Sequence, residues 1–497
     1  MKRTIASLLI ASIATGAWAA DRTMNTDIVV IGQGAAGTAA AFAAAELGAK
    51  VIGLEKKGIV GGTGNFSEGI FAVESSMQRA WNYNLTKDEV FQTIMRYGHW
   101  RSNARMVRAF VNKSADTIDW MKKHGVKFEK LFNNYPGGYY TWHIYEGRGA
   151  GWINTLQKKG KEVYGMEVLL NTPAEKLLMK DGKVAGVIAK DKNGDTITIN
   201  SKAVIIATGG FADNPEMMKK YTRFPGTDGI AQAGKNGVGI QMAWSAGGGK
   251  EGLEVQQSYR PGPRAVSTTN HVSATAKQPH LWLTPKGDRF CDETIMLDWP
   301  SAGNALERIG GQMWVVYDQK NLDDMVKNKG IDLGVGVMVP VATKLTKFHD
   351  EWDAAHKAGW AYKANTLEEL AKLTGMDPKR LQATVDEYNK SCDIRHDEMF
   401  AKKPEYLKPV KTGPFYAIKS VASSLGTLGG IKANDRFQVV SDKEDPIPHL
   451  YAAGSDVGGM YGDSYDLLMA GSTIGFAVNS GRIAAESAVK DLGLAKK

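Results

Sequence analysis

The chain has 497 residues, of which 43% are hydrophobic and 23% are charged, a composition typical of a globular protein with two or three domains. The formal net charge is +9, or +7 without Lys2 and Arg3, and no long run of Lys or Arg occurs. So small an excess of positive charge over so long a chain excludes a nucleic-acid-binding segment, and we expect no nucleic-acid partner.

Residues 1–20, MKRTIASLLIASIATGAWAA, have the features of a secretory signal peptide. A basic start precedes an apolar stretch from Ile5 to about Ala14, and Ala17-Trp18-Ala19 fits the small-x-small cleavage rule. We expect residues 1–19 to be removed and the mature chain to be periplasmic. An N-terminal membrane anchor is the alternative, although the apolar stretch is shorter than the roughly 20 residues that a span needs. We expect no membrane span after cleavage.

The sequence gives no sign of haem or metal. It contains two cysteines, Cys291 and Cys392, whose spacing allows a disulfide but does not require one. It has no CxxCH motif for c-type haem, and no Cys/His cluster with the spacing of metal ligands. We therefore expect no metal site and no haem.

The first strong motif is Thr26–Glu55, TDIVVIGQGAAGTAAAFAAAELGAKVIGLE. A β-branched run leads into a glycine turn, an alanine-rich helix follows, and a second apolar run ends on Glu55. This is the βαβ fingerprint of dinucleotide binding. Gly32 permits the tight turn, Gly34 lets a pyrophosphate approach the backbone, and Gly37 lets the helix pack closely. The amides of Ala35 and Ala36 open the helix and face the phosphates, while Glu55 accepts hydrogen bonds from a ribose.

The chain then alternates between glycine-rich loops and regular elements. Residues 61–69 form a glycine-rich loop, residues 87–125 are mostly helical, and residues 147–151 open another helix. Alternating runs with Asp-Gly and Asn-Gly turns predict an antiparallel meander with strands at 167–170, 176–180, 184–190 and 195–199. A separate buried strand at 202–207 is expected to return the chain to the parallel sheet.

Between residues 255 and 426 the character of the sequence changes. Several tryptophans lie here among loops rich in Pro and Gly, and Thr366–Asn389 predicts two amphipathic helices broken near Asp377-Pro378. The segments Leu450–Asp456 and Gly471–Gly475 then return to the style of the first domain. We therefore expect an α/β fold in which residues 24–254 and 427–497 form a nucleotide-binding domain and residues 255–426 form an inserted domain.

Several motifs occur together in a fixed order: GQGAAG at 32–37, EK at 55–56, GGTGNFSEG at 61–69, GRGAG at 147–151, ATGGFADN at 207–214, GDRF at 287–290, GTLGG at 426–430 and YAAG at 451–454. In this order they resemble the fumarate reductase/succinate dehydrogenase flavoprotein family. Within it, the chain is most similar to the exported reductases of fumarate, urocanate and related enoates. The resemblance implies a two-dinucleotide-binding-type FAD domain, a Rossmann-like parallel sheet with a small antiparallel meander. It also implies an inserted α+β capping domain that closes over the isoalloxazine.

The resemblance also implies which further residues contact FAD. They are Lys56, Gly62, Thr63, Asn65, Ser67, Ala174, Thr208, Gly209, Gly210, Asn236, Gly454, Ser455, Asp456, Ser472 and Ile474. Ser455 stands where relatives often carry a glutamate beside the ribityl chain, which leaves Asp456 as the candidate substitute. Members that attach FAD covalently use a histidine near the loop at 61–69, and this loop has none. We therefore expect non-covalent FAD.

The chain departs from its dicarboxylate-reducing relatives around the expected substrate. Tyr259 stands about where they carry a histidine, and Thr275–Gln278 lacks the arginine that donates their proton. Gly426–Gly430 replaces their HTMGG-like turn. Their second carboxylate-binding arginine falls about at Tyr465-Asp466. The resemblance therefore predicts a substrate other than fumarate or succinate.

Reduction of an activated C=C bond needs a hydride from flavin N5, a proton donor, and a cation or hydrogen-bond donor at the activating group. Arg260 and Arg264 flank the proline-rich loop at the cap entry and are the first candidates for the cationic clamp. The alternative for each arginine is a structural role in a surface salt bridge. Lys277, His271, Tyr259 and Tyr465 are the other candidate catalytic residues, and His271 can equally be a loop histidine.

These features favour a periplasmic FAD-dependent reductase of an unsaturated, arylacrylate-like or other non-fumarate acid, acting as a terminal respiratory reductase on a small-molecule substrate. An FAD-dependent dehydrogenase of a ring or acid, or a reductase of a sulfoxide, is the alternative. A non-catalytic flavin carrier is disfavoured because a pure electron carrier needs no cap. Without haem or a second flavin motif, electrons are expected from a separate small c-type cytochrome or FMN protein.

Overall fold

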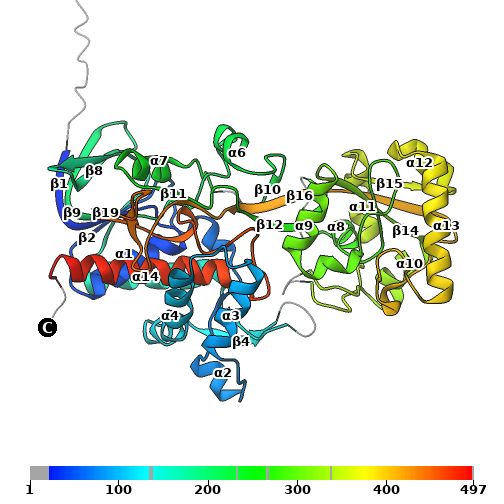
Figure 1. The fold of residues 1–497 in the computed structure, drawn as a ribbon, viewed down its shortest axis with the longest axis horizontal. Helices are drawn as coiled ribbons and strands as arrows, with labels where there is room; N and C mark the ends of the chain where they lie inside the picture. Colours follow the sequence, from blue (N-terminus) through cyan, green and yellow to red (C-terminus); the bar gives the residue numbers. More distant parts are fainter. Residues whose placement is uncertain are drawn as a thin grey trace, which may run out of the picture.

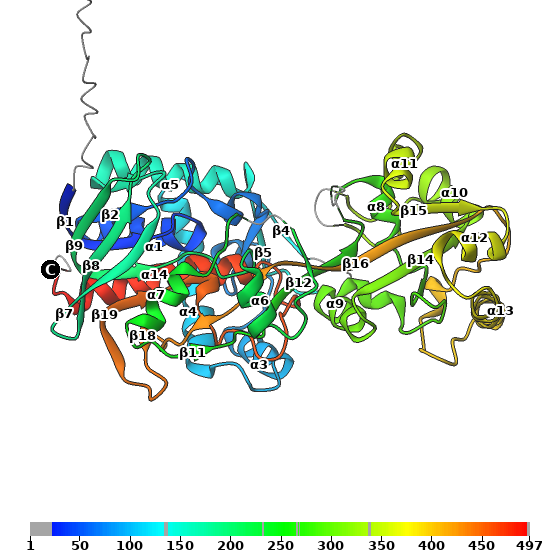
Figure 2. The ribbon, with the colours of Figure 1, turned by 90° about the horizontal axis from the view of Figure 1, so that it is seen from above.

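The computed structural model describes residues 22–133, 138–230, 233–264, 267, 269–335 and 339–494. The predicted signal peptide, residues 1–19, lies outside the described residues. The described chain forms two lobes that are joined by a long strand, β16 (Phe415–Thr427) (Figures 1 and 2). Among the described residues, no helix is both long and apolar enough to cross a membrane. Cys291 and Cys392 are both free thiols.

The first lobe is built on a large sheet with strand order β18-β19-β9-β1-β2-β6. Its strands are β18 (Gln438–Val440), β19 (Pro446–Ala452), β9 (Thr196–Ile206), β1 (Arg22–Ile31), β2 (Val51–Leu54) and β6 (Glu167–Leu169). The strands from β19 to β6 pair in parallel, and β18 is antiparallel to β19. This confirms the α/β class with a parallel nucleotide-binding sheet.

The meander differs from the prediction in two respects. The strand expected at 167–170 is β6, which pairs in parallel with β2 at the edge of the main sheet and is not part of the meander. The structure has β7 (Ala174–Lys180) and β8 (Lys183–Lys190), followed by the single strand β9. The two strands that were expected at 195–199 and 202–207 are therefore one. The first half of β9 pairs antiparallel with β8, and its whole length pairs in parallel with β1. Because residues 200–202 are polar, the sequence pattern alone suggested a break there.

Helices cover the sheet and extend the first lobe. They are α1 (Ala35–Glu46), α2 (Ser76–Ala80), α3 (Lys87–Tyr97), α4 (Ala104–Lys123), α5 (Arg148–Tyr164), α6 (Pro215–Tyr221), α7 (Val238–Ser245) and α14 (Ser472–Asp491). The short elements are η1 (Gly62–Phe66), η5 (Gly454–Asp456), β3 (Gly69–Phe71), β4 (Phe128–Phe132), β5 (Trp142–Tyr145), β11 (Lys250–Glu251) and β17 (Gly430–Ile431). The helical predictions at 87–125 and after 147 are confirmed.

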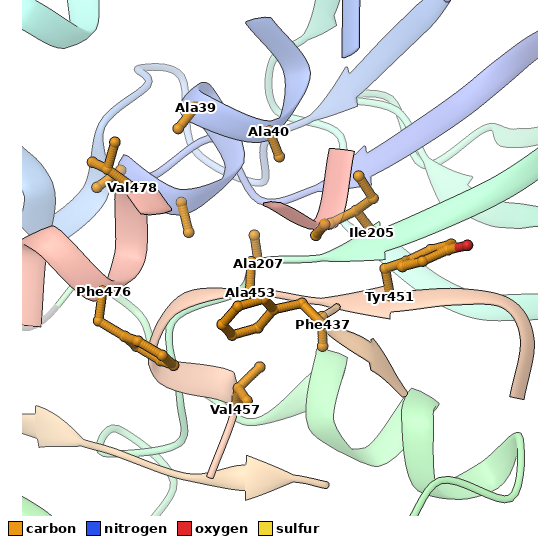
Figure 3. Packing of buried hydrophobic residues seen from close by; sticks show 14 of the residues in the cluster. Ala39, Ala40, Ile205, Ala207, Phe437, Tyr451, Ala453, Val457, Phe476 and Val478 are labelled. Atoms are coloured by element: carbon orange, nitrogen blue, oxygen red, sulfur yellow. The ribbon is translucent and has the colours of Figure 1, made fainter. Parts of the chain in front are cut away.

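The alanine-rich helix α1 is buried on all sides, which explains why its sequence shows no polar stripe. Figure 3 shows Ala39 and Ala40 of α1 close to Val478 of α14 and above Ile205 of β9. The small residues let the backbones approach closely. A Cβ added at Gly481 of α14 would lie 2.3 Å from the carbonyl oxygen of Ala36. Close packing of α1 and α14 thus joins the N-terminal βαβ unit to the C-terminal segment.

The second lobe is a cap built on a second sheet, in which β16 is central. Its strands are β10 (Asp228–Gly229), β12 (Gln256–Gly262), β13 (Leu281–Leu283), β14 (Gln312–Asp318), β15 (Ala361–Ala364) and β16. Its helices are α8 (His271–Thr275), η2 (Glu293–Leu297), α9 (Trp299–Arg308), α10 (Gln319–Asp323), η3 (Asp324–Asn328), α11 (Phe348–Lys357), α12 (Leu367–Thr374), α13 (Pro378–Ile394) and η4 (Pro404–Tyr406). The helices α12 and α13 confirm the predicted break before Pro378. The domain boundaries at 255 and 426 stay a prediction.

A buried ion cluster holds the cap together behind its sheet. Glu293 is fully buried and pairs with Arg289 at 2.8 Å and with Lys402 at 3.0 Å. Arg289 also binds Asp397 at 2.7 Å, and despite the opposing effect of burial, hydrogen bonds from Arg289 lower the pKa of Asp397 to about 2. Two cations are thus neutralised by two carboxylates away from water.

Glu293→Ala leaves the charges of Arg289 and Lys402 incompletely paired, so we expect it to lower the free energy of unfolding by about 3–5 kcal/mol. Glu368→Ala removes the exposed pair with Lys372 (2.8 Å) and should leave the stability unchanged within error. Urea denaturation followed by circular dichroism measures both variants. Equal stability of the two variants would contradict the account of the buried cluster.

Candidate active site

A cavity of about 880 Å³ lies at the carboxyl ends of the parallel strands and reaches the cap. Its walls come from the glycine turn after β1, the end of β2, the loop around η1, the turn after β9, the start of α14 and the cap residues Tyr259 and Trp299. In open α/β sheets, ligands bind at this carboxyl edge. One continuous cavity therefore connects the nucleotide-binding turn with the cap.

The glycine turn leaves no room for side chains on the protein side and is open on the cavity side. Gly32 has φ +90°, and a Cβ there would lie 2.4 Å from the carbonyl oxygen of Ala207. A Cβ on Gly37 would lie 1.8 Å from the carbonyl oxygen of Gly32, whereas one on Gly34 would meet nothing closer than Gly61 O at 3.8 Å. The amides at the start of α1 face this open side, which fits a pyrophosphate.

Glu55 at the end of β2 lines the same cavity and is buried. Its Oε2 accepts a hydrogen bond from the Gln33 amide at 3.0 Å, and its Oε1 accepts one from the Lys57 amide at 2.9 Å. These two bonds fix the carboxylate and leave further lone pairs for the hydroxyls of a ribose.

Asp456 lies under the turn after β9 rather than in the cavity wall. It is fully buried, accepts the Gly210 amide at 2.7 Å and the Thr208 hydroxyl at 3.0 Å, and also accepts the Thr208 amide. Its oxygens thus shape the turn that carries Thr208 and Gly209. This geometry favours a positioning role for Asp456 over the contact to the ribityl chain that the sequence suggested, while Ser455 lines the cavity.

Most of the predicted cofactor residues line the cavity. These are Gly32, Gly34, Ala35, Ala36, Glu55, Lys56, Gly62, Thr63, Ser67, Ala174, Thr208, Gly209, Asn236, Gly454, Ser455 and Ile474. Five lie one layer behind it: Gly37, Asn65, Gly210, Asp456 and Ser472. Asn65, for example, donates from Nδ2 to the Val60 carbonyl at 2.9 Å and holds the loop in shape. Their assignment as FAD contacts stays a prediction.

Further lining residues were not singled out from the sequence, among them Trp142, Lys235 and Gln257, and Trp299, which the sequence suggested as a core residue or an aromatic wall, also lines the cavity. Lys235 directly precedes the predicted Asn236, and Gln257 lies two positions before Tyr259 on β12, where side chains that share a face are spaced by two. This spacing could have identified Gln257. Nothing in the sequence pattern distinguishes Trp142 or Trp299 from a core tryptophan.

Of the candidate catalytic residues, Tyr259 and Tyr465 line the cavity. Tyr259 contacts Trp299 edge to face, with 4.8 Å between the ring centroids. Tyr465 is buried, which raises its pKa to about 12. Beside it, Gln257 donates from Nε2 to the Thr473 hydroxyl at 3.1 Å. The cap end of the cavity is thus an aromatic wall with a few hydroxyl and amide groups.

Arg260 and Lys277 lie together one layer behind this wall. The Arg260 guanidinium is 4.0 Å from the centroid of the Trp299 ring and 3% exposed, and its Nη1 has no hydrogen-bond partner among the described residues. Lys277 donates from Nζ to the Ser273 hydroxyl at 2.9 Å. Burial lowers the pKa of Arg260 to about 10, and burial together with the Arg260 charge lowers the pKa of Lys277 to about 7. The carboxylate of Glu68 acts on Arg260 and, together with Tyr259, opposes the effect of burial on the pKa of Arg260.

Arg264 and His271 lie away from the cavity lining. Arg264 is about half exposed and pairs with Asp228 at 3.5 Å, the salt bridge that was the alternative for each arginine. The Nδ1 of His271 accepts a hydrogen bond from the Lys347 amide at 2.9 Å. Within the described structure, Arg260 and Lys277 are therefore the candidate cations nearest the aromatic wall.

The fold and the cavity define a flavoprotein, since a glycine turn, a ribose acid and a long cavity that ends under a cap fit FAD. The chain matches the family described as FAD binding domain over residues 27–468 and belongs to it. It is 37% identical over 469 residues to a vinyl phenol reductase of Lactiplantibacillus plantarum, covering 92% of this chain and 94% of that protein. It is 29% identical over 449 residues to a urocanate reductase of Eggerthella lenta, covering 88% and 70%.

Solved structures agree with this assignment. The open conformation of a flavocytochrome c3 fumarate reductase has a TM-score of 0.70 and 26% identity, covering 94% of this chain and 78% of that chain. A 3-ketosteroid delta1-dehydrogenase from Sterolibacterium denitrificans has a TM-score of 0.76 at 20% identity, covering 94% and 100%, which shows a common fold alone. The chain is an FAD-dependent oxidoreductase, similar to the fumarate-reductase-like flavoproteins, as its motifs predicted.

Gly37→Ala should abolish FAD binding, because the added Cβ would overlap the Gly32 carbonyl oxygen and push α1 away from the turn. The control Gly194→Ala changes a glycine at φ +88° with no neighbour within 4 Å of the added Cβ. It should cost about 1–2 kcal/mol of stability and keep the flavin. The absorbance ratio of flavin to protein measures both. Full flavin content in Gly37→Ala would contradict the assignment.

Proposed function

We propose that the protein is an FAD-dependent reductase of a C=C bond conjugated to an aromatic ring that also bears an acidic group, either a carboxylate or a phenol. The observation that carries the proposal is the buried cation pair Arg260–Lys277 behind the aromatic wall of the cavity. The similarity to a vinyl phenol reductase supports an aromatic substrate.

The wall fits a flat ring. Tyr259, Trp299 and Tyr465 surround the cap end of the cavity, and Trp142 lines it from the first lobe. Aromatic faces and edges stabilise a bound arene beyond simple burial of area. Among the described lining residues the one arginine is Arg148, at the start of α5, whose neighbour Gly149 donates its amide to the Ser67 carbonyl at 2.7 Å. The backbone of Arg148 therefore lies beside the η1 loop.

The cations fit an acidic group. Burial disfavours the charged forms of Arg260 and Lys277, and an anion placed nearby offsets that cost. Burial and, after it, the charge of Arg260 lower the pKa of Lys277, which supports a shared site for the two cations in the interior of the cap. A carboxylate or phenolate against Trp299 would be attracted by both cations, and Nη1 of Arg260 remains available as a donor.

When bound, FAD supplies the hydride for the reduction. The chain must then hold the substrate, exclude water and deliver a proton to carbon. Lys277 lies behind the wall and suits charge balance, because with a pKa of about 7 it can take up a proton when an acidic group binds nearby. Tyr465 at the wall hydrogen bonds with the hydroxyl and amide groups of Thr473 and Gln257 and would orient the substrate.

We further propose that residues 1–19 direct export to the periplasm, that FAD is held non-covalently, and that a separate small c-type cytochrome or FMN protein supplies electrons for a respiratory role. Support comes from the signal-like sequence, from the absence of histidine in the loop at 61–69 and from the absence of a CxxCH motif. Localisation of the full chain with and without residues 1–19 tests export. Release of the flavin on acid precipitation tests whether FAD is held non-covalently.

A two-direction assay separates the reductase from a dehydrogenase of a flat ring. We expect enzyme with viologen as electron donor to reduce 4-vinylphenol or a hydroxycinnamate and to leave fumarate untouched. Oxidised enzyme with an artificial dye should not desaturate ring substrates. Silence across the aryl alkenes together with dye-linked desaturation would reject the proposal and favour the dehydrogenase.

Lys277→Met should lower kcat/KM by about 100-fold with unchanged flavin content, since it removes one of the two cations behind the aromatic wall. Lys277→Arg should restore much of the activity. In the wild type, turnover should fall as pH rises through about 7, because only the protonated form is a cation. In Lys277→Arg this fall should move to higher pH. The control Lys372→Met lies on the exposed face of α12 and should match the wild type. A flat pH profile from 6 to 9 would contradict this role.

A further inference from the structure

Lys235 is a buried lysine of the cavity wall and directly precedes Asn236, one of the predicted FAD contacts. The residue is 8% exposed, and its side chain lines the cavity. Its backbone amide donates to Asp213 Oδ2 at 2.8 Å, and its carbonyl accepts the Asp213 amide at 2.9 Å. The backbone of Lys235 is therefore fixed on the turn that follows β9.

The segment around Lys235 lies against the glycine turn. A Cβ added at Gly62 would lie 4.0 Å from Cβ of Ala233 and 3.9 Å from Cα of Gly34. On its other side, Lys56 donates from Nζ to the carbonyl of Gly234. The segment thus borders the open side of the turn, where the start of α1 offers its amides to an anion.

The ammonium of Lys235 makes one strong contact and no ion pair. Its Nζ donates to the carbonyl of Leu425 in β16 at 2.6 Å. Among the described residues no carboxylate lies within ion-pair distance of it. Asp213 and Asp456 act on it from farther away, and Asp456 is already taken up by Thr208 and Gly210.

The charged groups around this end of the cavity are Glu55, Lys56, Lys57, Asp213 and Asp456. Burial lowers the pKa of Lys235 to about 8, with Asp213 and Asp456 opposing the effect, and burial also lowers the pKa of Lys56. Burial therefore destabilises the charged form of Lys235. A ligand with two negative charges would remove that cost.

We propose that Lys235 is a charge-dependent anchor of FAD, whose ammonium adds positive charge to the cavity that takes up this anionic cofactor, and that its contact with Leu425 joins the cofactor site to the strand that enters the cap. The inference concerns the cofactor and is independent of the substrate proposed above. It assigns a role to a residue that the FAD motifs of the sequence do not include.

The pH dependence of FAD binding tests this role, because protonation of Lys235 is linked to binding. Without FAD, Lys235 loses its proton above about pH 8, whereas the bound anion raises its pKa, so binding takes up a proton in this range. The dissociation constant of FAD should therefore be constant below about pH 7.5 and should rise by up to about tenfold per pH unit above pH 8. It should also rise with salt concentration.

The experiment dilutes the holoenzyme and its variants and measures released FAD by fluorescence between pH 6.5 and 9.5. Lys235→Gln keeps a hydrogen-bond donor for Leu425 and removes the charge. It should weaken FAD binding at pH 7 by about 10- to 100-fold, with little pH dependence. Lys235→Arg keeps the charge and should bind nearly as the wild type, without the weakening above pH 8. The control Lys202→Gln removes a lysine that pairs with Asp27 at 2.8 Å on the surface and should leave both quantities unchanged.

Wild-type affinity and pH dependence in Lys235→Gln would overturn the inference, and so would equal losses in Lys235→Gln and Lys235→Arg, which indicate a role in packing rather than charge. If Lys235→Gln does not fold, the pH dependence of FAD binding in the wild type and in Lys235→Arg tests the inference. A dissociation constant that stays flat up to pH 9.5 in the wild type, or that rises equally in Lys235→Arg, would contradict the anchor.

Discussion

The structure depends on the close approach of α1 to the ends of β1 and β9. Gly32, Gly37 and Ala207 meet where any larger side chain would overlap a carbonyl oxygen, and Gly481 allows α14 the same approach to Ala36. This contact aligns the start of α1 with the carboxyl edge of the sheet, and it brings the C-terminal segment back onto the N-terminal βαβ unit. The cofactor end of the cavity therefore depends on glycines, whose lack of a side chain allows the backbone segments to approach one another closely.

The cap end of the cavity differs from the cofactor end because large side chains form its walls. The strand β16 crosses from the cap sheet into the first lobe and carries Leu425 to the cavity, while β12 carries Gln257 and Tyr259 beside it. Charge distinguishes the two ends as well. Around the glycine turn, backbone amides together with Lys56 and Lys235 provide positive charge for an anion. In the cap, Arg260 and Lys277 lie buried behind aromatic rings. A substrate that is both flat and acidic satisfies both properties of the cap.

These principles explain what the sequence could predict. The glycine turn, Glu55 and the strand after residue 202 are local patterns, since each needs only neighbouring residues and a known geometry. The sequence also supplied the family, the α/β class and the helices on either side of Pro378. It separated β9 into two strands because polar residues interrupt the run at 200–202, although pairing with β1 continues through them. Asp456 was predicted as a cofactor contact because Ser455 stands where relatives often carry a glutamate, and its side chain binds the Thr208–Gly210 turn, a contact that the local pattern does not reveal.

The substrate residues were harder to predict because their positions depend on contacts across the cap. Arg260 and Arg264 are equivalent in the sequence, both within one proline-rich stretch, but only Arg260 is covered by Trp299 while Arg264 meets Asp228 near solvent. Lys277 acquires its low pKa from burial and from Arg260, and neither can be read from a local pattern. Lys235 likewise gains its role from Leu425, which lies far away in the sequence.

The central claim is that the cap end of the cavity takes an aromatic ring with its acidic group toward Arg260 and Lys277. A crystal structure of the FAD-loaded enzyme with a saturated product, such as 4-ethylphenol or a hydroxyphenylpropionate, tests it most directly. The account predicts the ring against Tyr259 and Trp299, with the acidic group at the end of the cavity that faces the two cations. A product bound with its acidic group toward solvent, or outside the Tyr259–Trp299 wall, would contradict the account.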